Sequence, residues 1–340
     1  TLSVSGTFLV RSGILNSVHT FANDPGRGLF ILIFLFILIF LSIVVFFFFQ
    51  NSYEQKVKKI FWLSKETSIM INNWFMMYFL SVILIGTTYP IILEVLTNQK
   101  ISIGPPFYNK LIYPFLIPFL IIMAIGPNLN WIKNKFSKIK IKNLLYLIVS
   151  LLLSFLIVKI SEIKYLFSTV LFAGSFFLFL KVLEDFFKKS DNFPQKLSHF
   201  AFSIFILSIL FNGVLSKEFS ANMKVGDKLL YNDGYIKFEK LENFEKQNYK
   251  SLIANFEIRK KDKSKVNLNP EIRIYNQPKI LTSEADIKSN FFSDHFITVN
   301  IIKEDGFFNV RYQTKPFMIW IWASITLVAF GGILIFFRKL

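Results

Sequence analysis

The stretch that decides the fold runs from Gly28 to Gln50 and reads GLFILIFLFILIFLSIVVFFFFQ. It contains no charged residue. As an α-helix it would be about 34 Å long, and the hydrocarbon core of a bilayer is about 30 Å thick. We therefore expect this stretch to cross a membrane.

Further apolar stretches of similar length occur along the chain, at about 69–95, 111–125, 144–160, 165–183, 199–215 and 317–337. Residues 2–10 are a candidate for the end of another helix. Only 18% of the 340 residues are charged, against about 25% in soluble proteins. The sequence thus predicts a mainly α fold: a polytopic α-helical membrane protein with about seven spans.

The residue inventory excludes several kinds of site. The chain has no cysteine, which excludes thiolate nucleophiles, disulfides, iron–sulfur clusters and Cys-bound zinc. It has three histidines, and any metal or haem site must use one of them or ligands from another chain. The formal charge of +17 would suggest nucleic-acid binding in a soluble protein, but a membrane protein concentrates such charge in its inner loops.

The lysines predict the orientation. They cluster after the first, third and fifth spans and at the C-terminus, at Lys56, Lys58, Lys59, Lys65, Lys133, Lys135, Lys138, Lys140, Lys142, Lys188, Lys189, Lys196, Arg338 and Lys339. Loops rich in Lys and Arg stay on the cytoplasmic or matrix side. His19, the Gly104–Pro106 loop and residues 216–315 are then expected to face outward.

Residues 216–315 alternate with period two. Leu252, Ala254, Phe256 and Ile258 would share one face of a strand, and the Asp305-Gly306 and Asn232-Asp233-Gly234 segments are hairpin signals. This pattern predicts a small outward-facing β domain. The expected organisation is an outer loop at 1–27, a six-span bundle at 28–215, the β domain at 216–315 and a last membrane helix at 316–340.

The three histidines have different surroundings. His19 lies in a polar, glycine-bearing segment before the first span, where it is either a solvated loop residue or an axial haem ligand. His199 is expected to open the sixth span, where it is either a helix-end residue among headgroups or a haem ligand within the membrane. His295 alternates with Ile297 and Val299, which favours a packed position in the β domain.

The segment between the second and third spans is also unusual. Pro90, in Gly86-Thr-Thr-Tyr-Pro90, is expected to break the helix, and Gly104-Pro105-Pro106 to form a rigid outer turn. This corner is either a structural connection or a wall of an outward-facing pocket.

Several of these segments together resemble the C-terminal half of the CcmF family, the haem lyase component of cytochrome c maturation. The resemblance rests on residues 6–13, 17–19, 24–28, 86–90, 101–109, 126–131, 225–227 and 315–322. It implies that the protein attaches haem to apocytochrome c through thioethers to a Cys-x-x-Cys-His motif. The residues that the match includes beside the histidines are Arg11, Asp24, Tyr89, Pro90, Gly104, Pro105, Pro106 and Asn109.

The resemblance also implies partners and ligands. Haem would arrive from the chaperone CcmE, His19 would be an axial ligand of that substrate haem, and a CcmH-type protein would reduce the apocytochrome thiols. His199 would ligate a resident haem b that takes electrons from quinol. The protein would lie in a bacterial cytoplasmic or mitochondrial inner membrane, with its β domain on the periplasmic or intermembrane-space side.

The sequence departs from the family pattern in one large respect. Its five tryptophans do not cluster in an outer loop, whereas the family has a Trp-rich segment. That segment and the partner histidines of both haems would lie upstream of Thr1, so the chain is expected to be a fragment or one product of a split gene and inactive alone. A polytopic transporter and a haem b quinol-oxidoreductase anchor are the alternative interpretations.

Overall fold

The computed structural model describes residues 2–11, 25–49, 61–99, 101–132, 141–161, 166–188, 192–231, 234–260, 264–276, 280–302 and 306–338. The chain divides into two compact units. The first comprises Thr1–Ile122 and Gly126–Phe136, and the second comprises Met123–Ile125 and Ser137–Leu340. His19, Asp24 and the inner-loop lysines at 56–59 and 133–140 lie outside the described residues.

The first unit is helical. It contains α1 (Leu2–Arg11), α2 (Pro25–Phe49), α3 (Lys65–Thr97), α4 (Pro105–Ile125) and the short 3₁₀ helix η1 (Gly126–Asn128). Residues 2–11, placed by the sequence in an outer loop or at the end of a further helix, form α1, which packs against α2. The α3 helix begins after Ser64, whose hydroxyl accepts a hydrogen bond from the backbone N–H of Thr67 and so satisfies a free donor of the first turn.

Two expectations for the outer corner were wrong. Pro90 does not break its helix, because α3 continues through it to Thr97. Membrane helices tolerate proline because neighbouring helices and local backbone adjustments satisfy the carbonyl that the proline leaves without a donor. Pro105 and Pro106 do not form a turn but start α4, where the missing proline N–H costs no helical hydrogen bond.

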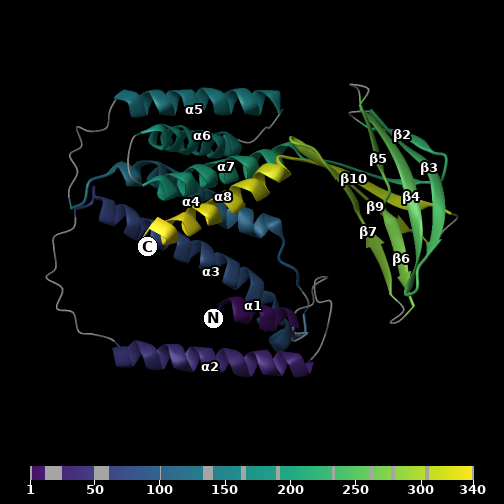
Figure 1. Ribbon diagram of the computed structural model, residues 1–340, viewed down its shortest axis with the longest axis horizontal. Helices are drawn as coiled ribbons and strands as arrows, with labels where there is room; N and C mark the ends of the chain where they lie inside the picture. The colour runs from purple at the N-terminus through teal and green to yellow at the C-terminus, as the bar shows by residue number, and fades with distance from the viewer. Residues whose placement is uncertain are drawn as a thin grey trace. The chain divides into compact units, whose positions relative to one another are not determined.

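The second unit carries four more helices, α5 (Ile141–Ile160), α6 (Leu166–Phe187), α7 (Phe193–Leu215) and α8 (Met318–Arg338). They lie side by side in that order, as Figure 1 shows. The closest contact is between α7 and α8, where a Cβ on Gly331 would lie 2.2 Å from the Ser198 hydroxyl oxygen and 3.0 Å from the Pro194 carbonyl oxygen. Glycine at position 331 therefore allows the two backbones to approach each other.

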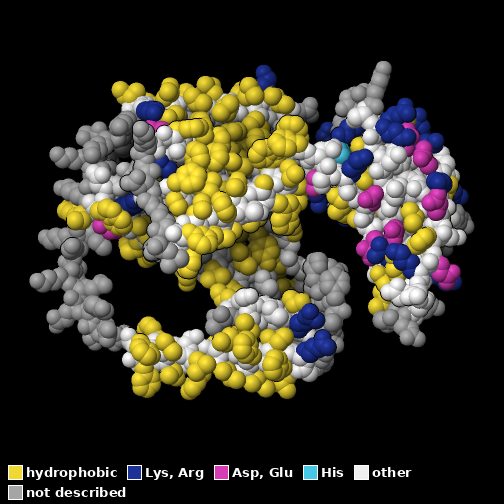
Figure 2. Space-filling model, in the orientation of Figure 1, with side chains coloured by type: hydrophobic (Ala, Val, Ile, Leu, Met, Phe, Trp, Pro, Cys, Tyr) yellow, Lys and Arg dark blue, Asp and Glu magenta, His cyan; other side chains and the backbone are white. Residues whose placement is uncertain are grey.

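Six helices of the described ranges are long and apolar enough to cross a membrane: α2, α3, α4, α5, α7 and α8. The remaining long helix, α6, corresponds to the predicted fifth span and is buried between α5 and α7, with Phe172 and Leu178 almost fully enclosed. Hydrophobic side chains cover the helices, whereas charged side chains of both signs are scattered over the β strands, as Figure 2 shows. The chain is an integral membrane protein.

Among the described residues, ten strands follow α7 and precede α8. They are β1 (Lys217–Met223), β2 (Lys228–Tyr231), β3 (Gly234–Glu245), β4 (Tyr249–Lys260), β5 (Lys265–Leu268), β6 (Glu271–Tyr275), β7 (Leu281–Glu284), β8 (Asp286–Ser289), β9 (Ser293–Ile301) and β10 (Phe308–Pro316). One sheet has the order β1-β10-β9-β8 and the other β2-β3-β4-β6-β7, with β5 paired to β4. The pairings are antiparallel.

The two sheets share one apolar core, which confirms the period-two prediction. Ala254, Phe256 and Ile258 of β4 are buried against Val299 of β9 and Val310 of β10. The predicted hairpins are present as the β2–β3 and β9–β10 pairs. The domain is therefore a sandwich inserted between two membrane helices, α7 and α8.

Candidate functional site

The predicted outer corner is formed by the end of α3 and the beginning of α4. Tyr108 of α4 packs directly on Gly86 of α3, since a Cβ on that glycine would lie 2.8 Å from the Tyr108 hydroxyl oxygen. Further along the same pair of helices, the Tyr78 hydroxyl donates to the Leu111 carbonyl over 3.0 Å, and the Tyr78 and Phe115 rings are 4.3 Å apart. The sequence motifs at 86–90 and 101–109 thus mark one helix–helix contact.

The other predicted corner residues are positioned by this contact. Tyr89 is 48% exposed, Asn109 is exposed, and Pro90 is half-buried in α3. Gly104 is the N-cap of α4 and lies directly before Pro105 and Pro106. The corner presents a phenol and an amide beside apolar helix ends, which suits contact with a large, partly apolar ligand better than acid–base chemistry.

His199 lies within α7, not at its start, because the helix begins six residues earlier with Pro194 in its first turn. On one side Ser198 faces α8, with its hydroxyl 3.4 Å from the Val328 carbonyl oxygen. On the other side Phe200 faces α6, with its ring 5.1 Å from that of Phe186. Successive helix residues are about 100° apart, so His199 lies on the face of α7 between these two contacts.

His199 has the features of one axial haem ligand. It is half-buried on a helix that can cross a membrane, and a neutral imidazole ligates iron without bringing charge into the hydrocarbon. No cluster of three or more metal-binding side chains occurs within the part of the chain that the structure describes. The burial and position of His199 therefore fit a single axial ligand to a haem, supplied by α7.

Of the remaining predicted site residues, Arg11 is exposed in the last turn of α1. His19 and Asp24 fall outside the described ranges. The structure places the corner residues 86–109 in its first unit and His199 in its second.

A buried lysine was missed by the sequence reasoning. Lys181 of α6 is nearly enclosed, and its Nζ lies 3.1 Å from both the Asn143 amide oxygen and a Glu184 carboxylate oxygen. Lys142 of α5 reaches the same carboxylate at 3.0 Å. The sequence did contain a signal for this group, because a lysine within an apolar segment is followed three residues later by a glutamate. The group fastens α5 to α6 and leaves its charges paired, so a structural role suffices.

His295 is buried on the inner face of β9, as the sequence predicted. Its Nδ1 is 2.7 Å from the Tyr312 hydroxyl oxygen, and the two rings are nearly parallel. Burial, together with the nearby Lys260 and Lys288, lowers the pKa of His295 to about 4, so the imidazole is neutral at physiological pH. A packed, neutral and hydrogen-bonded histidine of this kind is not available as a haem ligand.

Comparison with known proteins shows which families share this architecture. Residues 214–316, the strand domain, match the family model described as "CcmF C-terminal beta-sandwich". The chain is 30% identical over 345 residues to the cytochrome c-type biogenesis protein CcmF of Escherichia coli, covering 99% of this chain and 53% of that protein. A cytochrome c-type biogenesis protein of Rhodobacter capsulatus is 31% identical over 344 residues, covering 97% of this chain and 52% of that protein.

A solved structure, that of a cytochrome c haem lyase CcmF, shares the fold. It superposes with a TM-score of 0.63 at 18% sequence identity, covering 80% of this chain and 46% of that chain. The chain spans about half the length of the curated relatives that it matches. The family model that the strand domain matches is named for the C-terminal β-sandwich of CcmF.

Proposed function

Because the chain is similar along nearly its whole length to the C-terminal half of CcmF, we propose that it acts in cytochrome c maturation as part of a haem lyase. The observation that carries this proposal is the shared order of elements: membrane helices, then a β-sandwich, then a last membrane helix. A transporter or a quinol-oxidoreductase anchor would not require this inserted sandwich.

The proposed reaction joins haem to apocytochrome c. Each thiol of a Cys-x-x-Cys-His motif adds across a haem vinyl group, so that the sulfur bonds to one vinyl carbon and the thiol proton goes to the other. The haem is substrate, delivered by the chaperone CcmE, and His19 is proposed as one of its axial ligands. The exposed Tyr89 and Asn109, at the corner made by α3 and α4, are proposed to support this outer surface.

A resident haem b is proposed within the membrane, where it would supply one-electron transfer from quinol to keep the substrate iron reduced. His199 would hold this haem by its imidazole. Ser198 and Phe200 would fix the direction of His199, since their contacts with α8 and α6 set the rotation of α7 about its axis. Gly331 of α8 supports the same rotation of α7, because the absence of a Cβ leaves room for the Ser198 hydroxyl.

The proposed lyase needs further components. The N-terminal portion of the CcmF relatives, or a separate subunit corresponding to it, would provide the Trp-rich segment and the partner histidines. A CcmH-type protein would supply reduced apocytochrome thiols. The membrane is proposed to be the bacterial cytoplasmic or mitochondrial inner membrane.

The β domain is proposed to face the periplasm or intermembrane space. The chain contains no cysteine, so a single Lys250→Cys substitution, at an exposed position of β4, provides a unique label site. We expect an impermeant maleimide to label this variant in intact cells or mitoplasts. Labelling only after permeabilisation would contradict the proposed orientation.

The two histidine assignments can be tested in one preparation of the assembled complex. We expect His199→Ala to remove the haem b absorbance while the protein still accumulates. We expect His19→Ala to leave that absorbance unchanged but to abolish covalent haem on a reporter cytochrome c. His295→Gln is the matched control, because it alters the third histidine of the chain, which is packed in the β domain.

Each assignment has its own contrary result. Unchanged haem b content in His199→Ala would remove His199 from the membrane site. A normal yield of holocytochrome c in His19→Ala would make His19 a solvated loop residue. Complete absence of haem from the wild-type complex would favour the transporter interpretation instead.

A further inference from the structure

The β domain contains a cavity at the end that adjoins the membrane helices. It has a volume of about 140 Å³ and opens between the edge of one sheet, formed by β1 and β10, and the edge strand β2 of the other. Its lining includes Lys217, Phe219, Leu230, Tyr231, Tyr312 and Thr314. Sites for whole cofactors usually measure about 300 Å³ or more, so this cavity suits a small chemical group.

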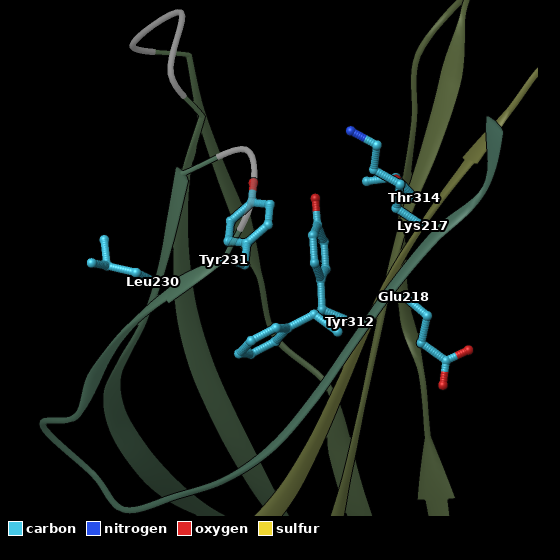
Figure 3. A pocket seen from close by; sticks show the side chains of 7 residues that line it. Lys217, Glu218, Leu230, Tyr231, Tyr312 and Thr314 are labelled. Atoms are coloured by element: carbon cyan, nitrogen blue, oxygen red, sulfur yellow. The ribbon is translucent and has the colours of Figure 1, made fainter. Parts of the chain in front are cut away.

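Hydrogen-bond donors converge at the mouth of this cavity. Figure 3 shows the hydroxyl groups of Tyr231 and Tyr312 pointing toward the same end, where the Lys217 and Thr314 side chains lie. Two phenol hydroxyls and an ammonium group are donors suited to an anionic oxygen ligand. The rings of the same two tyrosines, Tyr231 and Tyr312, form the apolar floor of the cavity, and their centroids are 5.6 Å apart.

His295 sets the donor capacity of Tyr312. A neutral imidazole carries its proton on one nitrogen only. If Nδ1 carries it, His295 donates to the Tyr312 oxygen, and the phenol proton is free to point into the cavity. An anion in the cavity favours this tautomer, so the buried histidine prepares Tyr312 as a donor.

The acidic residue that also lines the cavity, Glu218, does not oppose an anion. It is paired with Arg311 at 2.7 Å and accepts a hydrogen bond from Gln313 at 2.7 Å. In Figure 3 its carboxylate points away from the two phenol hydroxyls. Its charge is therefore neutralised on the outer face of the sheet, whereas Lys217 stands at the mouth.

The mouth of the cavity is close in the chain to two helices that can cross a membrane, which would bring it to the level of the lipid headgroups. Lys217 follows the end of α7 at Leu215 by two residues, and β10 leads directly into α8. At the same end of β9, the exposed Phe291 and Trp320 of α8 meet edge to face, and the Trp320 indole N–H donates to the Phe291 carbonyl over 3.1 Å. Tryptophan and exposed aromatic side chains at a helix end are typical of the membrane interface.

We propose that this cavity binds the phosphate of an anionic phospholipid headgroup, with Lys217, Tyr231 and Tyr312 as its donors. The lipid would anchor the sandwich to the bilayer surface beside α7 and α8. Basic sites at membrane-facing ends of proteins recognise headgroups by the same chemistry.

The test uses the full chain purified in detergent and native mass spectrometry with added lipids. We expect the chain to retain phosphatidylglycerol in preference to phosphatidylcholine. Because each variant removes one hydrogen bond to the charged phosphate, we expect Lys217→Gln and Tyr231→Phe each to weaken phosphatidylglycerol retention by roughly tenfold or more. Lys250→Gln, which removes an exposed lysine of β4 with the same change of charge, is the matched control.

Three results would overturn the proposal: equal retention of both lipids, equal loss in Lys217→Gln and Lys250→Gln, or unchanged retention in both cavity variants. Glycerol phosphate, added in solution, separates the two sources of the phosphate. If it binds as tightly as phosphatidylglycerol, the phosphate site stands but a soluble phosphate ester, not the membrane, supplies its ligand. Folding of each variant is checked by the trypsin resistance of residues 217–316.

Discussion

The membrane helices and the β domain use the same residue type in opposite ways. In α2, Phe30 and Phe48 are 72% and 82% exposed, whereas in the β domain Phe238 is fully buried and Phe256 is 1% exposed. The helix completes its backbone hydrogen bonds internally and can leave its side chains to lipid. The strands need neighbours for their hydrogen bonds, and their side chains then need a second sheet. A high apolar content therefore indicates exposure to lipid in the membrane helices and a packed core in the β domain.

The first prediction tests this contrast with one substitution in each region. Phe256→Ala removes a ring that stacks on Phe238 at 4.5 Å inside the sandwich core, and should destabilise the domain by about 3–5 kcal/mol. Phe48→Ala, on the exposed face of α2, should change stability by less than about 0.5 kcal/mol. The measurement is the urea concentration at which trypsin cuts residues 217–316, together with the thermal unfolding midpoint of the full chain in detergent.

A large effect from Phe48→Ala would break the comparison, because it would show α2 packed against protein rather than lipid. Phe256→Leu is the control for the core site. It keeps most of the buried volume and should cost less than the alanine variant.

The second prediction concerns the place where two membrane helices, α7 and α8, pack closely against each other. Gly331 and Gly332 are neighbours in α8, but only a Cβ at position 331 would meet α7, within 2.2 Å of the Ser198 hydroxyl oxygen. Gly331→Ala should destabilise the α7–α8 pair by about 1–3 kcal/mol, as overpacking does. Gly332→Ala should be neutral or stabilising by up to about 1 kcal/mol, because alanine is the better helix former.

Hydrogen exchange of the α7 and α8 amides measures both variants. Equal protection in the two would contradict the assigned contact. Since Ser198 precedes His199, Gly331→Ala should also perturb the haem b spectrum of the assembled complex, while Gly332→Ala should not.

The same contrast explains how much of the fold could be predicted from the sequence. Hydropathy located each long helix, because a span needs only length and apolar content. The sequence interpretation misjudged Pro90 and Pro105, because the effect of a proline depends on its position in the helix and on the packing around it. It placed the start of α7 at His199 because the polar residues before it hid the first turns.

Within the sandwich, alternation predicted which faces of β4 and β9 are buried, including His295. It did not predict the cavity. Lys217 and Tyr231 lie on consecutive strands that belong to different sheets, and Tyr312 lies on the last strand, so only the packing of two sheet edges brings them together. The buried Lys181 was missed for a similar reason, because its partner Asn143 belongs to another helix.

The third prediction uses pH to unfold the sandwich selectively. His295 has a pKa of about 4 when folded and about 6.5 when unfolded, so between these values the unfolded state binds more protons. Stability is full above pH 6.5 and should fall by about 1 kcal/mol per pH unit as the pH drops toward 4. The urea midpoint of the domain, followed by circular dichroism at each pH, should show this slope. His295→Gln should flatten it, and an unchanged slope would assign the acid sensitivity to other groups.

The smallest expected effect concerns a charge pair on the outer face of the sandwich. Glu218 of β1 is joined to Arg311 of β10 at 2.7 Å, and hydrogen bonds from Arg311 and Gln313 lower the pKa of its carboxyl group. Both side chains are about half exposed, so water and salt screen the pair, and exposed pairs contribute only about 0.2–1 kcal/mol. Glu218→Gln should therefore shift the urea midpoint of the domain slightly at low ionic strength and not at all at high ionic strength. A loss as large as that of Phe256→Ala would mean that the charge pair, and not the apolar core, holds β1 to β10 beside the cavity. The same variant should leave phosphatidylglycerol retention equal or higher, because it removes a negative charge next to Lys217.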